Sequence, residues 1–279
     1  YRRWLLQSNE GLTELLCDTI GDGFKKDASQ LKKFQKFATD SEVQKRLSDI
    51  KLENKKRLAK YIKDVEGIEV VPDSIFDVQA KRMHEYKRQH LNALNIISQY
   101  LYLKDNPNAD FVPRTYIFGA KAAPGYYIAK QMIRLISGLS ELLNKDENVR
   151  DKLRVVYLED YRVSVSELLM PASEVSEQIS LAGTEASGRG DVKLMRKGAL
   201  TIGTLDGANI EIRDAAGEDN FFLFGMTKQE VLDRRANGYK PEAIVKQNAE
   251  LKRVMDFVSK GFMDYSFSDL ANNIMYQDP

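Results

Sequence analysis

The chain contains 279 residues, enough for one large domain or two of ordinary size. Its 42 Lys and Arg against 41 Asp and Glu give a formal net charge of +1, which argues against a nucleic-acid-binding domain defined by bulk positive charge. One cysteine excludes an internal disulfide framework, and with only two histidines it supplies too few ligands for a zinc-finger-type site. No run of about 18 apolar residues occurs, so no transmembrane helix is expected.

The chain opens on Tyr1 without an initiator Met or an apolar signal core, which predicts an excerpt from a longer, cytoplasmic protein. Because histidine is scarce, any catalysis must use Lys, Arg, Glu, Tyr or a cofactor.

The first 66 residues predict helices. Apolar residues recur at helical spacing before the Gly-Asp-Gly segment 21–23, which ends a first helix. A long, strongly charged helix is expected from Ser41, with an apolar stripe among its Lys and Glu residues. Its many charges indicate a solvated face.

From residue 67 onward, short apolar runs alternate with helical patterns. Strands or extended segments are expected at 68–71, 74–78, 114–119, 153–158, 178–180, 199–202 and 221–224, and helices at about 83–103, 127–143 and 165–170. This alternation predicts βαβ units and a parallel sheet covered on both faces. We therefore expect one α/β domain, in which residues 1–66 form a helical N-terminal lead-in and residues 67–279 form the sheet-bearing part.

Four segments fall where strands are expected to end and helices to begin, which is where doubly wound sheets bind ligands. Residues 81–88, Lys-Arg-Met-His-Glu-Tyr-Lys-Arg, concentrate cationic groups that could converge on a phosphate or form a basic solvent face. Residues 119–126 combine small residues with Pro124, which suits a close approach to a ligand or simply a tight turn.

The third segment, residues 159–164, is Glu-Asp-Tyr-Arg-Val-Ser and is open to interpretation as a helix cap with a surface ion pair. The fourth, residues 183–193, is glycine-rich and ends in Lys193. It is neither a Walker A loop nor a dinucleotide fingerprint. Its backbone N–H groups could still cradle a phosphate, and a partly buried lysine there could form a Schiff base.

Taken together, these segments strongly resemble the α-glucan phosphorylases, that is, the glycogen, starch and maltodextrin phosphorylases. The likeness extends over nearly the whole chain, from Arg2-Arg3-Trp4-Leu5 to the stretch 220–226. Other matching stretches are 76–79, 81–88, 121–126, 161–164, 176–180, 185–188, 198–204 and 206–209. So many matches in the same order are highly specific.

The resemblance implies a Rossmann-like, doubly wound domain that forms the C-terminal half of a two-domain GT-B glycosyltransferase, with the N-terminal domain and the terminal helices absent. It implies a hexosyltransferase that cleaves α-1,4-glucan with inorganic phosphate, releases glucose 1-phosphate and retains the anomeric configuration. The implied cofactor is pyridoxal phosphate, whose phosphate acts as the acid–base group, consistent with the scarcity of histidine. No metal, nucleic acid or membrane is implied; a homodimer is expected for the full-length protein.

The resemblance also assigns roles to individual residues. For the cofactor, Lys193 matches the Schiff-base lysine, Lys81 a group on the cofactor phosphate, and Gly190 a backbone donor near it. The remaining matches are Trp4, Tyr161 and Arg162 as the cofactor pocket, Arg82 and Lys87 as holders of the substrate phosphate, and Tyr86, Glu185, Ser187 and Gly188 as the wall of the glucosyl subsite. Glu185 is interpreted as an acceptor of sugar hydroxyls and not as a nucleophile.

The chain departs from the family pattern around the lysine. The family usually has Gly-Thr-Gly-Asn-Met-Lys and then Leu-Asn before a glycine, whereas here residues 188–193 are Gly-Arg-Gly-Asp-Val-Lys and Arg196-Lys197 precede Gly198. Asp160 stands where Asn is usual.

Two other hypotheses remain. The chain could be a non-catalytic cofactor- or glucan-binding piece, because half of the cleft is missing and the loop is altered. It could also be a nucleotide-sugar glycosyltransferase of the same architecture, although such an enzyme needs no Schiff-base lysine. For the isolated 279 residues we expect no turnover, because the glucan chain needs both walls of the cleft.

Overall fold

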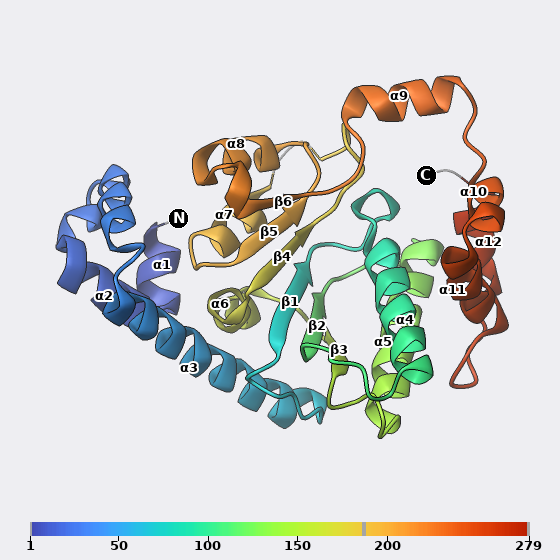
Figure 1. Ribbon diagram of the computed structural model, residues 1–279, viewed down its shortest axis with the longest axis horizontal. Helices are drawn as coiled ribbons and strands as arrows, with labels where there is room; N and C mark the ends of the chain where they lie inside the picture. The colour runs from blue at the N-terminus through green and yellow to red at the C-terminus, as the bar shows by residue number, and fades with distance from the viewer. Residues whose placement is uncertain (1, 186–187, 278–279) are drawn as a thin grey trace.

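A computed structural model describes residues 2–185 and 188–277. Its centre is a six-stranded, all-parallel sheet with the order β3-β2-β1-β4-β5-β6 (Figure 1). The strands are β1 (Ile75–Ala80), β2 (Arg114–Gly119), β3 (Leu153–Leu158), β4 (Val175–Gln178), β5 (Leu200–Gly203) and β6 (Phe221–Leu223). The expected doubly wound α/β fold is confirmed.

Helices cover both faces of the sheet (Figure 1). On one side lie α4 (Gln89–Asp105) and α5 (Tyr127–Lys145), and outside them α10 (Pro241–Gln247), α11 (Ala249–Lys260) and α12 (Ser268–Tyr276). On the other side lie α3 (Ser41–Glu66), α6 (Val163–Ala172), α7 (Arg189–Met195) and α8 (Ala208–Ala216). The remaining helices are α1 (Arg2–Ser8), α2 (Glu10–Ile20), α9 (Lys228–Ala236) and the short 3₁₀ segments η1 (Asp22–Lys25), η2 (Ala28–Phe37), η3 (Glu85–Lys87) and η4 (Glu218–Asn220).

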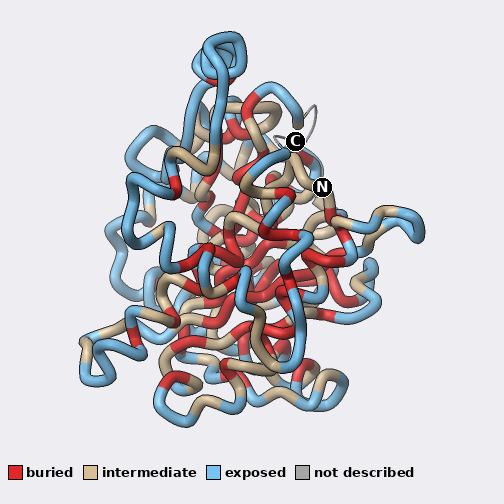
Figure 2. Tube along the Cα trace, turned by 90° about the vertical axis from the view of Figure 1, so that its right-hand side faces the viewer, coloured by how far each residue is buried: buried red, intermediate tan, exposed pale blue. Residues whose placement is uncertain are grey.

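Buried residues concentrate in the middle of the molecule (Figure 2), and they form two cores on opposite sides of the sheet. One core joins α4, α5 and α11 to β2 and β3, around Tyr116 and Phe118. The other joins α3 and α6 to β1, β2 and β3, around Phe76 and Ile117. Neighbouring residues of β2 therefore enter opposite cores, as expected for a strand whose side chains alternate between two covered faces.

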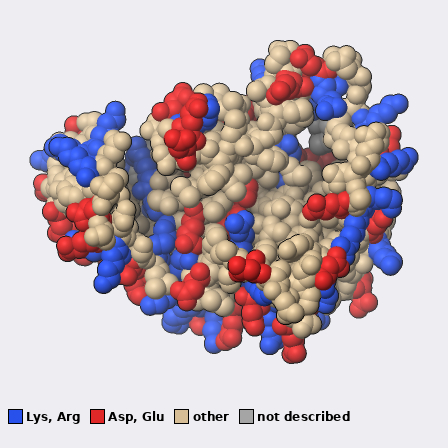
Figure 3. All heavy atoms as spheres, viewed as in Figure 1, with Lys and Arg blue, Asp and Glu red and all other residues tan. Residues whose placement is uncertain are grey.

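The long charged helix α3 forms as predicted. Asp40 accepts hydrogen bonds from the backbone N–H groups of Glu42 and Val43 at its start, and Gly67, with φ of 69°, ends it. Figure 3 shows both signs of charge interspersed along this side of the molecule. Pairs such as Lys60 with Asp64, four residues apart, are exposed and contribute little to stability.

Two lysines of α3 fix the lead-in to the sheet-bearing part. The Lys51 ammonium donates to the carbonyls of Pro171, Ser173 and Lys197 at 2.9, 2.6 and 3.0 Å, and burial lowers its pKa to about 8. Lys55 lies 2.8 Å from a carboxylate oxygen of Glu174. The same carboxylate oxygen accepts the backbone N–H of Phe76 in β1. Helix α3 is thus held at the N-terminal end of the sheet by charge-assisted hydrogen bonds.

The sequence predicted β2 and β3 with the bounds that the structure has. Residues 68–71, expected to be a strand or an extended segment, form no strand and lie in an irregular segment before β1. The strand expected at 178–180 lies earlier, at Val175–Gln178, because side chains take the next carbonyls: Arg88 donates to that of Ile179 and Thr204 to that of Ser180.

The helix expected from residue 83 begins later, at Gln89. The preceding residue, Arg88, has a left-handed backbone with φ of 55°, which interrupts helical hydrogen bonding. Upstream, the Met83 N–H donates to the Lys121 carbonyl at 3.1 Å, and the Tyr86 carbonyl accepts the Leu181 N–H at 2.8 Å. Contacts with two distant loops therefore hold residues 81–88 out of the helix.

Within the described ranges, no helix is both long and apolar enough to cross a membrane, and no cluster of three or more His, Cys, Asp or Glu suits a metal ion.

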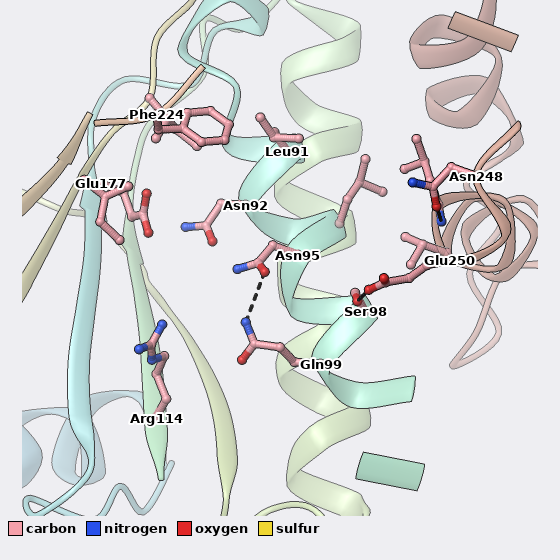
Figure 4. A pocket seen from close by; sticks show the side chains of 15 residues that line it. Leu91, Asn92, Asn95, Ser98, Gln99, Arg114, Glu177, Phe224, Asn248 and Glu250 are labelled. Carbon is pink, nitrogen blue, oxygen red and sulfur yellow. Dashed lines mark hydrogen bonds between the residues drawn. The ribbon is translucent and has the colours of Figure 1, made fainter. Parts of the chain in front are cut away.

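A buried pair of carboxyl groups lies on the α4 side of the sheet. Asp77 of β1 is 1% exposed and Glu177 of β4 is 6% exposed. Glu177 faces a cavity of about 570 Å³ that is also lined by Asn92, Asn95 and Arg114 (Figure 4). Burial and mutual repulsion raise the pKa of Glu177, and burial raises that of Asp77 to about 6 despite Arg114, 3.5 Å from Asp77. The pair therefore retains a proton at pH values where an exposed pair has none.

This pair predicts a pH-dependent stability. The folded protein keeps a proton on Asp77 that the unfolded chain releases above its usual pKa of 3.8, so wild type loses stability as the pH rises from about 4 to about 6. In Asp77→Asn, the free energy of unfolding relative to wild type should therefore rise by about 2–3 kcal/mol between about pH 4 and pH 7, measured by urea unfolding.

Asp105→Asn is the matched control. Asp105 is exposed, and its hydrogen bond with Arg253 lowers its pKa, so its contribution to stability changes mainly below about pH 4. This variant should therefore change little relative to wild type between about pH 4 and pH 7. The same pH trend in both variants, or none in Asp77→Asn, would contradict the buried-pair assignment.

Candidate active site at the carboxyl ends of the strands

The strand order reverses between β1 and β4, where the chain leaves the two neighbouring strands toward opposite sides of the sheet. In doubly wound sheets, such a switch point opens a crevice at the carboxyl ends of the strands. The loop after β1 carries Lys81, Arg82, Tyr86 and Lys87, and the loop after β4 carries Glu185. The topology therefore brings the first and fourth of the predicted segments together.

Two ammonium groups converge on one carboxylate in this crevice. The Nζ atoms of Lys81 and Lys87 lie 3.7 and 3.9 Å from the same oxygen, Oε2 of Glu185. The two lysine side chains are only 10% and 14% exposed. Because two cations face this one anion, an additional anion such as a phosphate would be electrostatically favoured here. Arg82, in contrast, is exposed.

Asp206, which the sequence analysis did not assign to the site, orients Glu185. Its Oδ2 accepts the backbone N–H groups of Thr184 and Glu185 at 3.1 and 2.8 Å. The hydroxyl of Ser180 donates to the Glu185 carboxylate at 3.3 Å. Asp206 lies after β5, immediately before a glycine that precedes α8. An Asp-Gly pair at this position indicates a turn, and this was the sequence signal available for Asp206.

Helix α7 adds a buried carboxyl group to the same cluster. Asp191 is 3% exposed; burial raises its pKa, Lys81 and Lys87 act in the opposite direction, and Glu185 raises it further. Its carboxylate packs so closely on Gly188 that a Cβ there would lie 2.0 Å from Oδ2. Gly188 therefore lets the start of α7 approach the cationic cluster.

Aromatic rings line the side of the loop at 81–88. The rings of His84 and Tyr86 stack with centroids 5.5 Å apart, and His84 lies 5.7 Å from the ring of Tyr126. Burial, followed by the charges of Lys87 and Arg82, lowers the pKa of His84. The Tyr126 hydroxyl donates to the Glu85 carboxylate, which ties this loop to the one after β2.

Lys193 lies on another side of α7 from Asp191, since residues two apart in a helix point in directions about 160° apart. Its Nζ sits 3.6 Å from the centroid of the Trp4 ring, so these two predicted site residues are in contact. Burial, together with the charge of Arg189, lowers the pKa of Lys193. Lys193 therefore carries a partly shielded amine that deprotonates more easily than an exposed lysine.

The loop after β3 provides a third wall. The Tyr161 ring packs on Gly119, where a Cβ would lie 2.8 Å from the ring. Arg162 is exposed and lies 2.8 Å from Asp160, which also binds Lys121 at 2.6 Å. Tyr161 thus faces the end of β2, whereas the Arg162 guanidinium is engaged in an exposed ion-pair network.

Of the predicted site residues, the structure joins Lys81, Lys87 and Glu185 in one cluster and Lys193 with Trp4 in another. Helix α7, which begins at Gly188–Arg189 and includes Gly190, connects the two clusters. Ser187 lies outside the described residues.

The groups present fit pyridoxal phosphate chemically. A phosphate requires convergent cationic donors, which Lys81 and Lys87 supply. An aldehyde requires an amine that is partly unprotonated, which Lys193 supplies beside an aromatic ring. Burial raises the pKa of Asp191, the carboxyl group of α7 on the phosphate side.

Comparisons with known proteins agree with this geometry. The family model described as carbohydrate phosphorylase matches residues 1–279. A glycogen phosphorylase of Synechocystis is 48% identical over 282 residues, covering 100% of this chain and 33% of that protein. The liver form of glycogen phosphorylase from Ovis aries and the muscle form from Homo sapiens are each 46% identical to this chain. Each alignment covers 99% of this chain and 33% of the relative. The chain thus spans about a third of the length of these curated relatives.

The role of Asp206 predicts a local change in loop stability. Asp206→Ala should increase hydrogen exchange at the Thr184 and Glu185 amides by about tenfold or more, because each loses a hydrogen bond to a charged acceptor. Asp214→Ala, at an exposed carboxylate on α8, is the control and should leave these amides unchanged. Unchanged exchange in Asp206→Ala would show that the carboxylate does not hold the loop.

Proposed function

Because this chain belongs to the carbohydrate phosphorylase family, we propose that it forms the cofactor-binding wall of an α-glucan phosphorylase. The observation that carries the proposal is the convergence of Lys81 and Lys87 on the carboxylate of Glu185 at the switch point of the sheet. In this proposal the enzyme is a hexosyltransferase that releases glucose 1-phosphate from the non-reducing ends of α-1,4-glucan with retention. An N-terminal domain supplies the facing wall, and the full-length protein forms a homodimer.

Each wall residue has a defined task in this proposal. Lys193 would hold pyridoxal phosphate through its amine, and the Trp4 ring beside that amine would form part of the cofactor pocket. Lys81 and Lys87 offset the repulsion between two neighbouring phosphates, which the low dielectric of a buried site would otherwise make large. When bound, the cofactor supplies a phosphate with a pKa near 6 that can give and take a proton.

The remaining groups position the sugar and the substrate phosphate. Glu185, fixed by Asp206, accepts hydrogen bonds from glucosyl hydroxyls when the incoming phosphate takes over its lysine partners. Arg82, exposed at the mouth of the crevice, closes on the substrate phosphate as the second cation beside Lys87. In the reaction, the glycosidic C–O bond breaks, a bond from C1 to a phosphate oxygen forms, and the departing glucan oxygen receives a proton.

Cofactor attachment gives the first test. When this chain is joined to an amino-terminal phosphorylase domain, addition of pyridoxal phosphate should produce a new absorbance band. Borohydride should abolish this band and leave the cofactor permanently attached to Lys193. Lys193→Ala should lose the band, whereas Lys130→Ala, at an exposed lysine of α5, should keep it. A band that persists in Lys193→Ala would exclude this lysine as the attachment site.

Turnover gives the second test. The joined protein should release glucose 1-phosphate from glycogen, and the isolated 279 residues should not, because one wall cannot enclose the glucan. In the joined protein, Lys87→Gln should reduce kcat/KM by about 100-fold or more, through the loss of a cation at the reacting phosphate. A joined protein that binds the cofactor but never turns over would favour the alternative, a non-catalytic binding module.

A further inference from the structure

Lys197 is a buried lysine whose ammonium has uncharged partners. It is 2% exposed, and its Nζ donates to the Trp4 carbonyl at 2.8 Å and to the Ser8 hydroxyl. Its own carbonyl accepts the ammonium of Lys51 at 3.0 Å. The residue therefore connects α1, α3 and the end of α7, and among the residues that the structure describes no carboxylate binds its ammonium directly.

Lys193 lies in α7, and Lys197 lies in the turn that follows the last helical residue, Met195. Both ammonium groups lie near the ring of Trp4, with Nζ atoms 3.6 and 5.7 Å from its centroid. Their separation is therefore at most about 9 Å, comparable to the Debye length of about 8 Å at physiological ionic strength. Two like charges in this arrangement repel each other, so the charge of each ammonium favours loss of the proton of the other.

The two ammonium groups are bound differently. Lys197 is held by two hydrogen-bond acceptors, whereas the described contact of Lys193 is with the face of an aromatic ring. We propose that Lys197 is a positioning residue that fixes Trp4 beside Lys193 and, through its charge, keeps the Lys193 amine available for bond formation. This inference rests on the proposed function only in one respect: it takes pyridoxal phosphate as the aldehyde with which the Lys193 amine reacts.

The surrounding charges define the pH range of this effect. Arg189, on α7, also repels a proton from Lys193, and Lys51, on α3, adds positive charge beside Lys197. Glu167, on α6, favours the charged form of Lys197, and the Trp4 ring favours that of Lys193. Burial, followed by the charge of Lys193, lowers the pKa of Lys197 to about 8, so the charge of Lys197 is present at neutral pH and disappears in mildly alkaline solution.

The availability of the amine matters because only the unprotonated nitrogen reacts. Its lone pair forms a C–N bond to the aldehyde carbon, and the aldehyde oxygen leaves as water with the two protons of the amine. The rate of attachment at a given pH is therefore proportional to the unprotonated fraction of Lys193, which increases tenfold for each unit by which its pKa falls.

The test uses the 279-residue chain without cofactor. Trinitrobenzenesulfonate is applied over a range of pH, and mass spectrometry of the digest gives the rate of modification at Lys193. In Lys197→Gln, this rate at neutral pH should fall about three- to tenfold, the effect of one nearby positive charge. The deficit should vanish above about pH 9, where Lys197 of the wild type is uncharged.

Two further variants separate charge from packing. Ser8→Ala keeps the charge and removes one acceptor, so its rate should stay within about twofold of wild type. Lys152→Gln removes a remote ammonium that is also held by two carbonyls, and it should have no effect. A deficit in Lys197→Gln that is the same at every pH, or absent at neutral pH, would overturn the proposal.

Wild type alone provides a readout if Lys197→Gln does not fold. In wild type, the rate of Lys193 modification should rise less steeply between about pH 8 and 9 than it would if Lys193 titrated independently, because Lys197 loses its charge in this range. A single titration at the ordinary lysine pKa would refute the coupling. Borohydride trapping with pyridoxal phosphate then separates the two proposals: no adduct in any variant contradicts the proposed function, while the trinitrobenzenesulfonate profile still decides the role of Lys197.

Discussion

Lys81 and Lys87 are brought within 4 Å of the same carboxylate oxygen, and much of the fold can be understood as the means of keeping them there. Two partly buried cations repel each other, so each must be held by the chain and not by its partner. The side chain of Gln79 in β1 donates to the Lys87 carbonyl, and that of Gln89 in α4 donates to the Arg82 carbonyl. These hydrogen bonds fix the loop after β1 at both ends.

The charge balance of the cluster depends on parts of the chain that are distant in sequence. Glu185 arrives from the loop after β4, held by Asp206 from the loop after β5, and Asp191 arrives from α7. The parallel sheet makes this assembly possible, because it presents the carboxyl ends of all its strands at one edge. The overall charge of +1 thus conceals a local arrangement in which an anionic ligand has a defined place.

The sequence predicts the elements that depend on local pattern and fails where distant contacts decide. The apolar runs 114–119 and 153–158 correspond to β2 and β3 because strands covered on both faces are continuously apolar. The helix expected from residue 83 starts at Gln89, because hydrogen bonds to the loops at Lys121 and Leu181 shape residues 81–88. The family resemblance drew attention to Lys81, Lys87 and Glu185. The local pattern at Asp206 indicates only a turn, and its contacts with the backbone of Thr184 and Glu185 depend on the fold.

Helix α7 is short, yet it carries both halves of the chemistry on different sides. Asp191 faces the cationic cluster, and Lys193 faces Trp4 on α1, so any movement of α1 relative to α7 would change the surroundings of the amine without touching the phosphate side. Lys197 and Lys51 oppose such movement by linking α1 to α7 and α7 to α3. The helical lead-in is therefore part of the site: it supplies the aromatic wall and, through two buried lysines, the rigidity that keeps the wall in place.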